Sequence, residues 1–545
     1  MSVRHPFDAV VIGGGHNGLV CASYLAGAGM KVRLIEVRDQ VGGAAVTESF
    51  HPGFRNSTAS YTVSLLHPKV IKDLNLAEHG LKIVERAAAN FLPLSDNQYL
   101  LMGRSLPEIQ GEVARFSTRD AQSLPEYYAR LERVASVVRE LWLKTPVNLG
   151  QGGWTGDFLS ALSLARLAHK IEAQTRADLL DFFTKSAGDL LDHWFESAPL
   201  KAALGFDAIV GHFASPYTPG SAYVLLHHAL GEVNGKRGAW GHALGGMGAI
   251  SAAMRKEAER RGVEILTGCA VTQVCVDQRG AQGVLLADGR LIEGRCVVSA
   301  INPKLLYTRL IAPPLLEPDF LRRIKQYHCA SGSFRMNVAL SELPNFSCLP
   351  GNNAALHHQS GIVLAPSLRY MEEAYFDARR LGCSRAPVVE LVIPSIVDDS
   401  LAPPGQHVAS LFCQHFNPVL PNGLDWAEIK EPAADLVIDT VNQYAPNFKA
   451  SVLGRMVLSP LDLEQRFGLV GGDIFHGALT LDQLWTARPL LGYGAYRGPI
   501  AGLYMCSAGT HPGGGVTGAP GHNAAREIIR DFKKGARRWK RVTSS

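Results

Sequence analysis

A short apolar run and a glycine-rich turn near the N-terminus constrain the fold more than any other part of this 545-residue chain. Residues 8–12 (DAVVI) are typical of a buried parallel strand. Three glycines follow in the order G-x-G-x-x-G: Gly13, Gly15 and Gly18. A helical pattern then leads into a second apolar strand, residues 31–35, which ends at Glu36. Strand, turn, helix and strand make a complete βαβ unit, so the sequence predicts a Rossmann-type parallel sheet.

Each residue type in this unit has a physical task. Gly13 permits the tight turn, Gly15 lets the backbone approach a pyrophosphate, and Gly18 allows close packing of helix on strand. The helix N-terminus attracts the anion, and Glu36 would accept hydrogen bonds from a ribose. A glycine turn that merely joins two elements is the alternative. The strand, the helix and the acid at these offsets favour dinucleotide binding.

Composition favours a globular α/β protein of two to four structural units, because apolar residues make up 46% of the chain and charged residues 19%. Six positive charges lie in residues 533–541, which leaves the rest of the chain close to neutral. No nucleic-acid partner is expected from that distribution. No apolar stretch is long enough to span a membrane, and residues 1–7 lack a signal-peptide pattern, so we expect a cytoplasmic protein.

Nine scattered cysteines contain no C-x-x-C pair, so neither a zinc site nor a disulfide framework is predicted, and no metal is expected. Cys269 and Cys275 lie in residues 264–276, which are rich in β-branched residues, and we expect both to pack in a core. Disulfide reductases carry paired cysteines just after the first nucleotide unit, where this chain has residues 42–46 (GGAAV). With no such pair and no second complete NAD-binding unit in the sequence, direct reduction by NAD(P)H is not expected.

Further motifs add a family resemblance. Residues 36–43 read E-x-R-x-x-x-G-G, and three more segments follow at 240–248 (WGHALGGMG), 297–303 (VVSAINP) and 508–521 (AGTHPGGGVTGAPG). Together these resemble the flavoprotein superfamily of amine oxidases, phytoene desaturases and GDP-dissociation inhibitors, in particular its phytoene-dehydrogenase-like branch. The resemblance covers nearly the whole chain.

The resemblance implies FAD as the cofactor. It implies that Val271 contacts the adenine half of FAD through its backbone. Residues 508–521 would return to the first βαβ unit and place backbone N–H groups and a helix N-terminus, near Ala519, against the flavin. The predicted cofactor-binding residues are Gly13, Gly15, His16, Asn17, Gly18, Glu36, Val37, Arg38, Gly42, Gly43, Ala44, Val271, Gly509, Gly518 and Ala519.

The expected fold class is α/β, with a Rossmann-type FAD-binding domain interrupted by a mixed α+β substrate domain. We assign residues 1–90, 240–305 and 485–545 to the FAD-binding domain, and residues 90–240 and 305–485 to the substrate domain. Residues 105–205 read as mostly helical, and the capping-box pattern at 123–126 (SLPE) predicts a helix start there. Gly513, Gly515 and Gly518 form a second G-x-G-x-x-G, but no strand and acid follow it, so it predicts no second nucleotide domain.

The resemblance implies an oxidoreductase that removes hydride from a hydrophobic substrate to flavin and passes electrons to oxygen or a quinone. A flavin amine oxidase and a non-catalytic hydrophobic-ligand-binding protein of the GDP-dissociation-inhibitor-like fold are the alternatives. His476, His511 and His522 are weak catalytic candidates, because they lie in segments expected near the flavin. The basic tail at 533–541 could contact an anionic membrane surface or simply be solvated, and a monomer or homodimer is expected.

Overall fold

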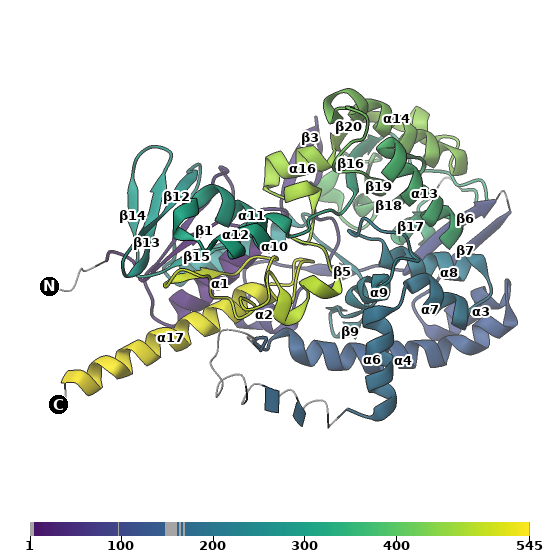
Figure 1. Cartoon of the computed structure of the whole chain (residues 1–545). Coiled ribbons are helices and arrows are strands. Elements are labelled where there is room, and N and C mark those ends of the chain that lie inside the picture. Colours follow the sequence, from purple (N-terminus) through teal and green to yellow (C-terminus); the bar gives the residue numbers. More distant parts are fainter. Residues whose placement is uncertain are drawn as a thin grey trace.

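The computed structural model describes residues 5–95, 97–147, 171–351 and 353–543, with isolated positions between 158 and 169. One of its two main sheets has five parallel strands in the order β11-β2-β1-β15-β21. Figure 1 labels β1 and β15 of this sheet. The strands are β1 (Ala9–Ile12), β2 (Val32–Ile35), β11 (Glu264–Leu266), β15 (Val297–Ser299) and β21 (Leu503–Met505). The parallel Rossmann-type sheet predicted from the glycine turn is therefore confirmed, and distant segments complete it.

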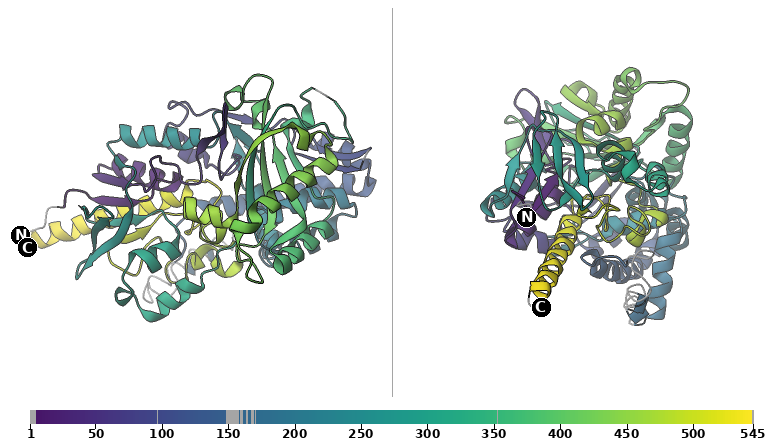
Figure 2. Two further views of the ribbon diagram at one scale, coloured as in Figure 1. Left: turned by 90° about the horizontal axis from the view of Figure 1, so that it is seen from above. Right: turned by 60° about the vertical axis from the view of Figure 1, so that its left-hand side comes forward.

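Side chains of β1 alternate between two apolar layers, as a strand buried on both faces requires. Ala9 and Val11 share a core with helices α1 (His16–Gly27), α10 (Gly248–Arg260) and α17 (Ala519–Thr543). Val10 and Ile12 pack on the opposite face, against the antiparallel strands β12 (Val271–Asp277), β13 (Gly280–Leu286) and β14 (Leu291–Glu293). The result is three layers, with α17 extending beyond them (Figure 2).

The second main sheet has seven strands in the order β20-β16-β19-β18-β17-β6-β7. They are β6 (Asn90–Ser95), β7 (Gln98–Met102), β16 (Ser333–Leu340), β17 (Gly361–Leu364), β18 (Cys383–Val392), β19 (His407–Phe416) and β20 (Val452–Leu458). On β19, Leu411 packs in a core with α14 (Trp426–Tyr444), whereas Phe412 packs in a core with the helical region. The helical region contains α3 (Leu106–Ala114), α4 (Thr118–Trp142), α6 (Ala173–Thr184), α7 (Ala187–Trp194), α8 (Ala198–Gly205) and α9 (Ser221–Ala229).

Shorter elements join these layers. They include β3 (Thr47–His51), β4 (Phe54–Ser57), α2 (Pro68–Asp73), β5 (Ile83–Glu85), β10 (Gly241–Ala243), α11 (Pro303–Leu305), α12 (Pro318–Gln326), α13 (Leu368–Leu381) and α16 (Pro460–Phe467). The domain boundaries stay a prediction. No helix of the described residues combines the length and apolar character needed to cross a membrane.

Two local predictions were wrong. The helix start predicted at Ser123 lies inside α4, which begins after Ser117, because the Ser117 hydroxyl accepts the Asp120 N–H at 3.0 Å. Residues 264–276 are divided between β11 and β12. Cys269 lies in the turn between them, partly buried against the apolar core, and Cys275 is partly buried on β12, so neither is the fully buried core residue expected.

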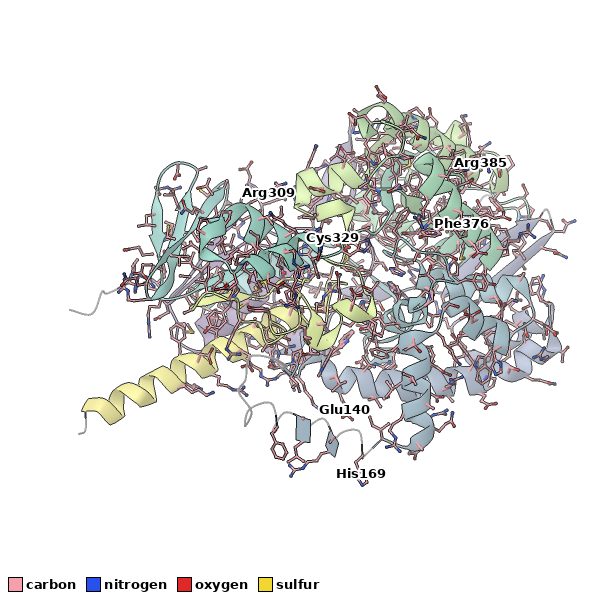
Figure 3. All side chains as sticks on the ribbon, in the orientation of Figure 1. Glu140, His169, Arg309, Cys329, Phe376 and Arg385 are labelled. Atoms are coloured by element: carbon pink, nitrogen blue, oxygen red, sulfur yellow. The ribbon has the colours of Figure 1, made fainter. Side chains whose placement is uncertain are left out.

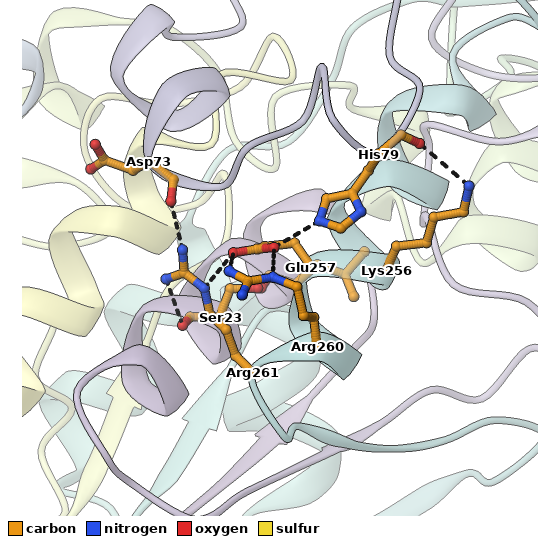
Figure 4. Close-up of polar contacts among 8 residues, drawn as sticks. Ser23, Asp73, His79, Lys256, Glu257, Arg260 and Arg261 are labelled. Carbon is orange, nitrogen blue, oxygen red and sulfur yellow. Dashed lines mark hydrogen bonds and ion pairs between the residues drawn. The ribbon is translucent and has the colours of Figure 1, made fainter.

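A buried carboxylate ties α10 to the nucleotide helix α1. The side chain of Glu257 is fully buried and accepts bonds from His79 (2.7 Å), Arg260 (2.7 Å) and Arg261 (2.6 Å), as Figure 4 shows. Arg261 in turn donates to the backbone oxygen of Ser23 in α1, at 3.2 Å. Burial alone would raise the pKa of Glu257, but hydrogen bonds from Arg260, His79 and Arg261 outweigh it and lower the pKa to about 2.

A Glu257→Gln variant is expected to lose about 3 kcal/mol of unfolding free energy, because two guanidinium groups lose a buried partner. Since the folded pKa of Glu257 lies below its ordinary value of 4.5, its stabilisation is present above pH 4.5 and is lost as pH falls toward 2. Thermal melts of the wild type and of Glu257→Gln at neutral and acid pH measure this loss of stability. Glu259→Gln, which removes an exposed i,i+4 pair with Arg255 on the same helix, is the control and should change little. Equal melting temperatures of Glu257→Gln and Glu259→Gln at neutral pH would contradict the prediction.

Candidate functional site

A cavity of about 550 Å³ extends from the N-terminal glycine turn to the seven-stranded sheet. One part of its wall comes from the five-stranded sheet and its loops, including Gly13, Gly15 and Glu36. Another part comes from the second sheet, including Arg335 on β16 and Phe412 on β19. Figure 3 shows Arg309, a further wall residue, at the junction of the two sheet regions. The cavity therefore brings together segments that lie hundreds of residues apart in sequence.

Two glycines of the turn have different tasks: Gly18 allows close packing, and Gly15 leaves space for a ligand. A Cβ at Gly18 would overlap the carbonyl oxygen of Gly13, so Gly18 is required for α1 to approach β1. A Cβ at Gly15 would meet no protein atom closer than the Cα of Gly43, at 3.9 Å. Because Gly15 lines the cavity, the space left by its missing side chain is open to a ligand. The α1 N-terminus carries no side-chain cap and no acid in its first turn, which leaves its N–H groups available to an anion.

Glu36 stands at the end of β2 on the cavity wall, with only 5% of its surface exposed. Its carboxylate accepts the N–H of Gly14 at 2.6 Å and the N–H of Arg38 at 2.9 Å. The second glycine pair packs on the first turn, since the N–H of Gly42 donates to the Gly14 oxygen at 2.8 Å. Gly42 and Gly43 have φ values of 131° and 57°, which favour glycine at both positions. This contact explains the E-x-R-x-x-x-G-G spacing.

The structure brings most of the predicted cofactor-binding residues to this cavity. Its wall contains Gly13, Gly15, His16, Asn17, Glu36, Val37, Arg38, Gly43, Ala44 and Val271. Five predicted residues do not line it: Gly18, Gly42, Gly509, Gly518 and Ala519. The C-terminal glycine segment contributes Ala508, Gly514, Gly515 and Val516 instead. A Cβ at Gly518 would meet Val70 and Val20, so that glycine and the start of α17 pack against neighbouring elements.

Val516 has a left-handed backbone, with φ of 58°, on the cavity wall. A β-branched residue is strained in that conformation. Such strain is concentrated at functional sites, which supports a binding role for this segment.

Of the three candidate histidines, only His476 lines the cavity. Burial, helped by His16 and Arg488, lowers the pKa of His476 to about 3, and its Nδ1 has no hydrogen-bond partner among the described residues. His511 instead bonds the Leu141 oxygen at 3.1 Å, and His522 packs edge-on against Tyr24. His476 is thus neutral at physiological pH and is the one of the three catalytic candidates placed to meet a ligand.

Arg488 is a functional residue that the sequence did not reveal. It is fully buried and donates to the backbone oxygens of Phe475 (2.7 Å), Gly477 (3.0 Å) and Ala508 (2.9 Å). It therefore fixes the loop that carries His476 to the C-terminal glycine segment. No motif surrounds Arg488, and its partners are carbonyl groups that every residue has, so no sequence signal could have identified it.

The open space at Gly15, the uncapped α1 N-terminus and the Glu36 carboxylate fit the pyrophosphate and ribose of FAD. Buried polar atoms without a described partner, His16 Nε2 and Asn17 Oδ1, belong to residues of the same wall. The cavity wall continues beyond the glycine turn with Tyr61, Arg335 and Phe412. No sequence pattern indicated these three residues.

Known proteins are similar to this chain in sequence or in fold. A family model described as flavin containing amine oxidoreductase matches residues 18–333, more than half of the chain. Pyridine nucleotide-disulfide oxidoreductase domain-containing protein 2 of Rattus norvegicus is 43% identical, covering 97% of this chain and 94% of that protein. The lycopene-forming phytoene desaturase of Pseudescherichia vulneris is 26% identical over 93% of this chain and 96% of its own. Cyclohexylamine oxidase from Brevibacterium oxydans shares the fold, with a TM-score of 0.58 and 15% identity over 97% of this chain and 99% of its own.

Proposed function

We propose that this chain, which belongs to the flavin-containing amine oxidoreductase family and is an FAD-dependent oxidoreductase, oxidises a hydrophobic substrate by removing hydride from an activated C–H bond. One observation carries the proposal: a single cavity joins the dinucleotide cradle to a wall of apolar and aromatic side chains. The aromatic and aliphatic members of that wall include Tyr61, Leu65, Val210, Phe412 and Phe475. Such a wall would exclude water from the reacting carbon.

In this proposal the glycine turn and Glu36 hold the pyrophosphate and ribose, and Val271 meets the adenine half. FAD, when bound, supplies the hydride acceptor. Gly514, Gly515 and Val516 offer their backbone to the reacting end of the cofactor, and the neutral imidazole of His476, whose Nδ1 has no partner among the described residues, is available for a hydrogen bond. Oxygen or a quinone is the proposed electron acceptor.

The phytoene desaturase relative supports a hydrophobic substrate, whereas the solved amine oxidase is similar in fold alone. The complete glycine cradle and Glu36 argue against a non-catalytic binding protein, which would not need them. Contact of the basic tail with anionic membranes stays a prediction, since the side chains beyond residue 535 lie outside the described residues. A monomer or homodimer likewise stays a prediction.

Anaerobic mixing of the purified yellow protein with a panel of compounds tests the proposal. An unsaturated terpenoid, a long-chain fatty acid and a primary alkylamine are each added, and the flavin absorbance is followed. We expect bleaching by a terpenoid or fatty compound and none by the amine. Bleaching by the amine alone would make the chain an amine oxidase. A folded, colourless and flavin-free preparation would favour the non-catalytic alternative.

A further inference from the structure

Arg335 on β16 is a buried cation on the cavity wall with no carboxylate partner. Only 1% of its surface is exposed, and within the described ranges no Asp or Glu oxygen lies within 4.0 Å of its guanidinium group. It donates to the Leu411 oxygen at 2.8 Å and to the Ser410 hydroxyl at 2.9 Å. A guanidinium group has five N–H donors, and the Nε of Arg335 is buried with no partner. The side chain that lines the cavity thus has an incomplete set of hydrogen bonds.

Two aromatic rings fix the position of this guanidinium group. Its central carbon lies 4.8 Å from the ring centre of Tyr61 and 5.6 Å from that of Phe412. The two rings stack on each other, with centres 5.0 Å apart and an angle of 28° between their planes. The cationic position beside this aromatic pair is therefore taken by Arg335 itself. An ammonium substrate would meet a like charge there, whereas an anion would meet a preorganised partner.

The charges around Arg335 leave an excess of positive charge. Arg86 is paired with Glu390 at 3.1 Å, and the Tyr61 hydroxyl also donates to Glu390, so this carboxylate is already engaged. The remaining acid is Asp207, whose pKa is raised to about 7 by burial and by the charge of Glu390. Burial lowers the pKa of Arg335 only to about 10, so it stays charged at neutral pH.

Arg335 and Arg86 thus lie near Glu390, which already has two partners, and near Asp207, whose pKa is raised by burial. A ligand carboxylate would give Arg335 the anionic partner that no described side chain supplies within 4.0 Å. Removing a charge from water is costly, so an unbalanced buried arginine indicates a site completed by its ligand.

We propose that Arg335 receives the carboxylate of an amphiphilic substrate, an acid whose hydrocarbon chain extends along the apolar wall. This inference rests on the proposed function, because it takes the cavity as the substrate site. It narrows the substrate from a hydrophobic compound to a hydrophobic carboxylic acid. An ammonium substrate would meet the like charge of Arg335, which disfavours amine oxidation in this cavity.

Three probes of equal chain length test the inference: decanoate, decanol and decylamine. Each is titrated into the FAD-loaded protein, and binding is measured both by calorimetry and by the shift of the flavin absorbance. Because a hydrogen-bonded charge pair is lost with the neutral head group, we expect decanoate to bind at least about tenfold more tightly than decanol. Decylamine should bind most weakly. Equal binding of decanoate and decanol, or preference for decylamine, would overturn the inference without any mutation.

Variants test whether Arg335 causes the preference for decanoate over decanol. Arg335→Met replaces the guanidinium group by an apolar, unbranched side chain and should remove the preference for decanoate over decanol, whereas Arg335→Lys should keep part of it. Arg455→Met is the matched control, because Arg455 pairs with Val338 of β16 in the same sheet but forms ion pairs with Glu431 and Asp435 away from the cavity. An undiminished preference in Arg335→Met would overturn the inference.

Different results would contradict the carboxylate site at Arg335 and the proposed function. A protein that holds flavin but shows no carboxylate preference contradicts only the role of Arg335. A protein that holds no flavin contradicts the proposed function, and calorimetry still measures the preference for decanoate.

Discussion

A Gly15→Ala variant is expected to fold like the wild type and to purify with little bound FAD. The added Cβ meets no protein atom closer than 3.9 Å, and the backbone φ of Gly15 is −65°, which any residue adopts. The Cβ would instead enter the space in which the backbone approaches the pyrophosphate. Lost hydrogen bonds to a charged group weaken binding by about 1.5–3 kcal/mol. The flavin absorbance per protein, with the melting temperature of the apoprotein, measures the effect.

Two further variants separate cofactor binding from folding. Gly18→Ala forces α1 away from β1, because its Cβ overlaps the Gly13 carbonyl, so it should lower the melting temperature of the apoprotein itself. Glu36→Ala removes a ribose acceptor and should weaken FAD retention by about 1.5–3 kcal/mol. Full FAD retention by Gly15→Ala would show that the pyrophosphate lies elsewhere.

The nucleotide-binding half of the fold was predictable because its signals are local. The strand, the three glycines, the helix and Glu36 occupy residues 8–36, and each residue type has a backbone or packing reason that holds in any context. The Gly42–Gly43 pair was predictable for the same reason, since positive φ values strongly favour glycine.

The ligand-facing half of the cavity was not predictable, because it depends on contacts between distant segments. Tyr61, Arg335 and Phe412 become neighbours only when strands β16 and β19 pair beside the loop that carries Tyr61. No spacing in the sequence records that arrangement. The wall position of His476 likewise depends on the buried Arg488, which binds carbonyl groups rather than a recognisable motif.

The start of α4 was predicted wrongly because two similar sequence patterns occur there and tertiary contacts favour the first. Residues 117–120 and 123–126 both have a serine followed three positions later by an acid. At the first position the acid Asp120 also accepts the N–H groups of Glu196 and Ser197, at 2.9 Å and 2.8 Å. Those bonds to a distant segment fix Ser117 as the cap. Ser123 then lies within the helix, and its hydroxyl donates to the Arg119 oxygen at 3.0 Å.

NADH is expected to leave the flavin absorbance nearly unchanged under anaerobic conditions, at a rate at least about 100-fold below that of a true substrate. The second glycine run leads into α17, which packs on α1 and continues to residue 543 without a further strand. The described part of the chain therefore offers one nucleotide-binding βαβ unit, and FAD occupies it in the proposed function.

The neighbouring pair Cys21 and Cys506 lies away from the cavity. Cys21 and Cys506 are near neighbours, but both are fully buried in the helix-side core and neither lines the cavity. Cys269 does line the cavity, where its sulfur accepts a bond from Arg290 at 3.3 Å.

Stopped-flow mixing with NADH and NADPH measures the rate of flavin reduction, and dithionite confirms in the same preparation that the flavin can be reduced. Fast, saturable bleaching by NADH would reverse the proposed direction of electron flow and make the enzyme a reductase, whereas slow bleaching leaves the substrate as the hydride donor.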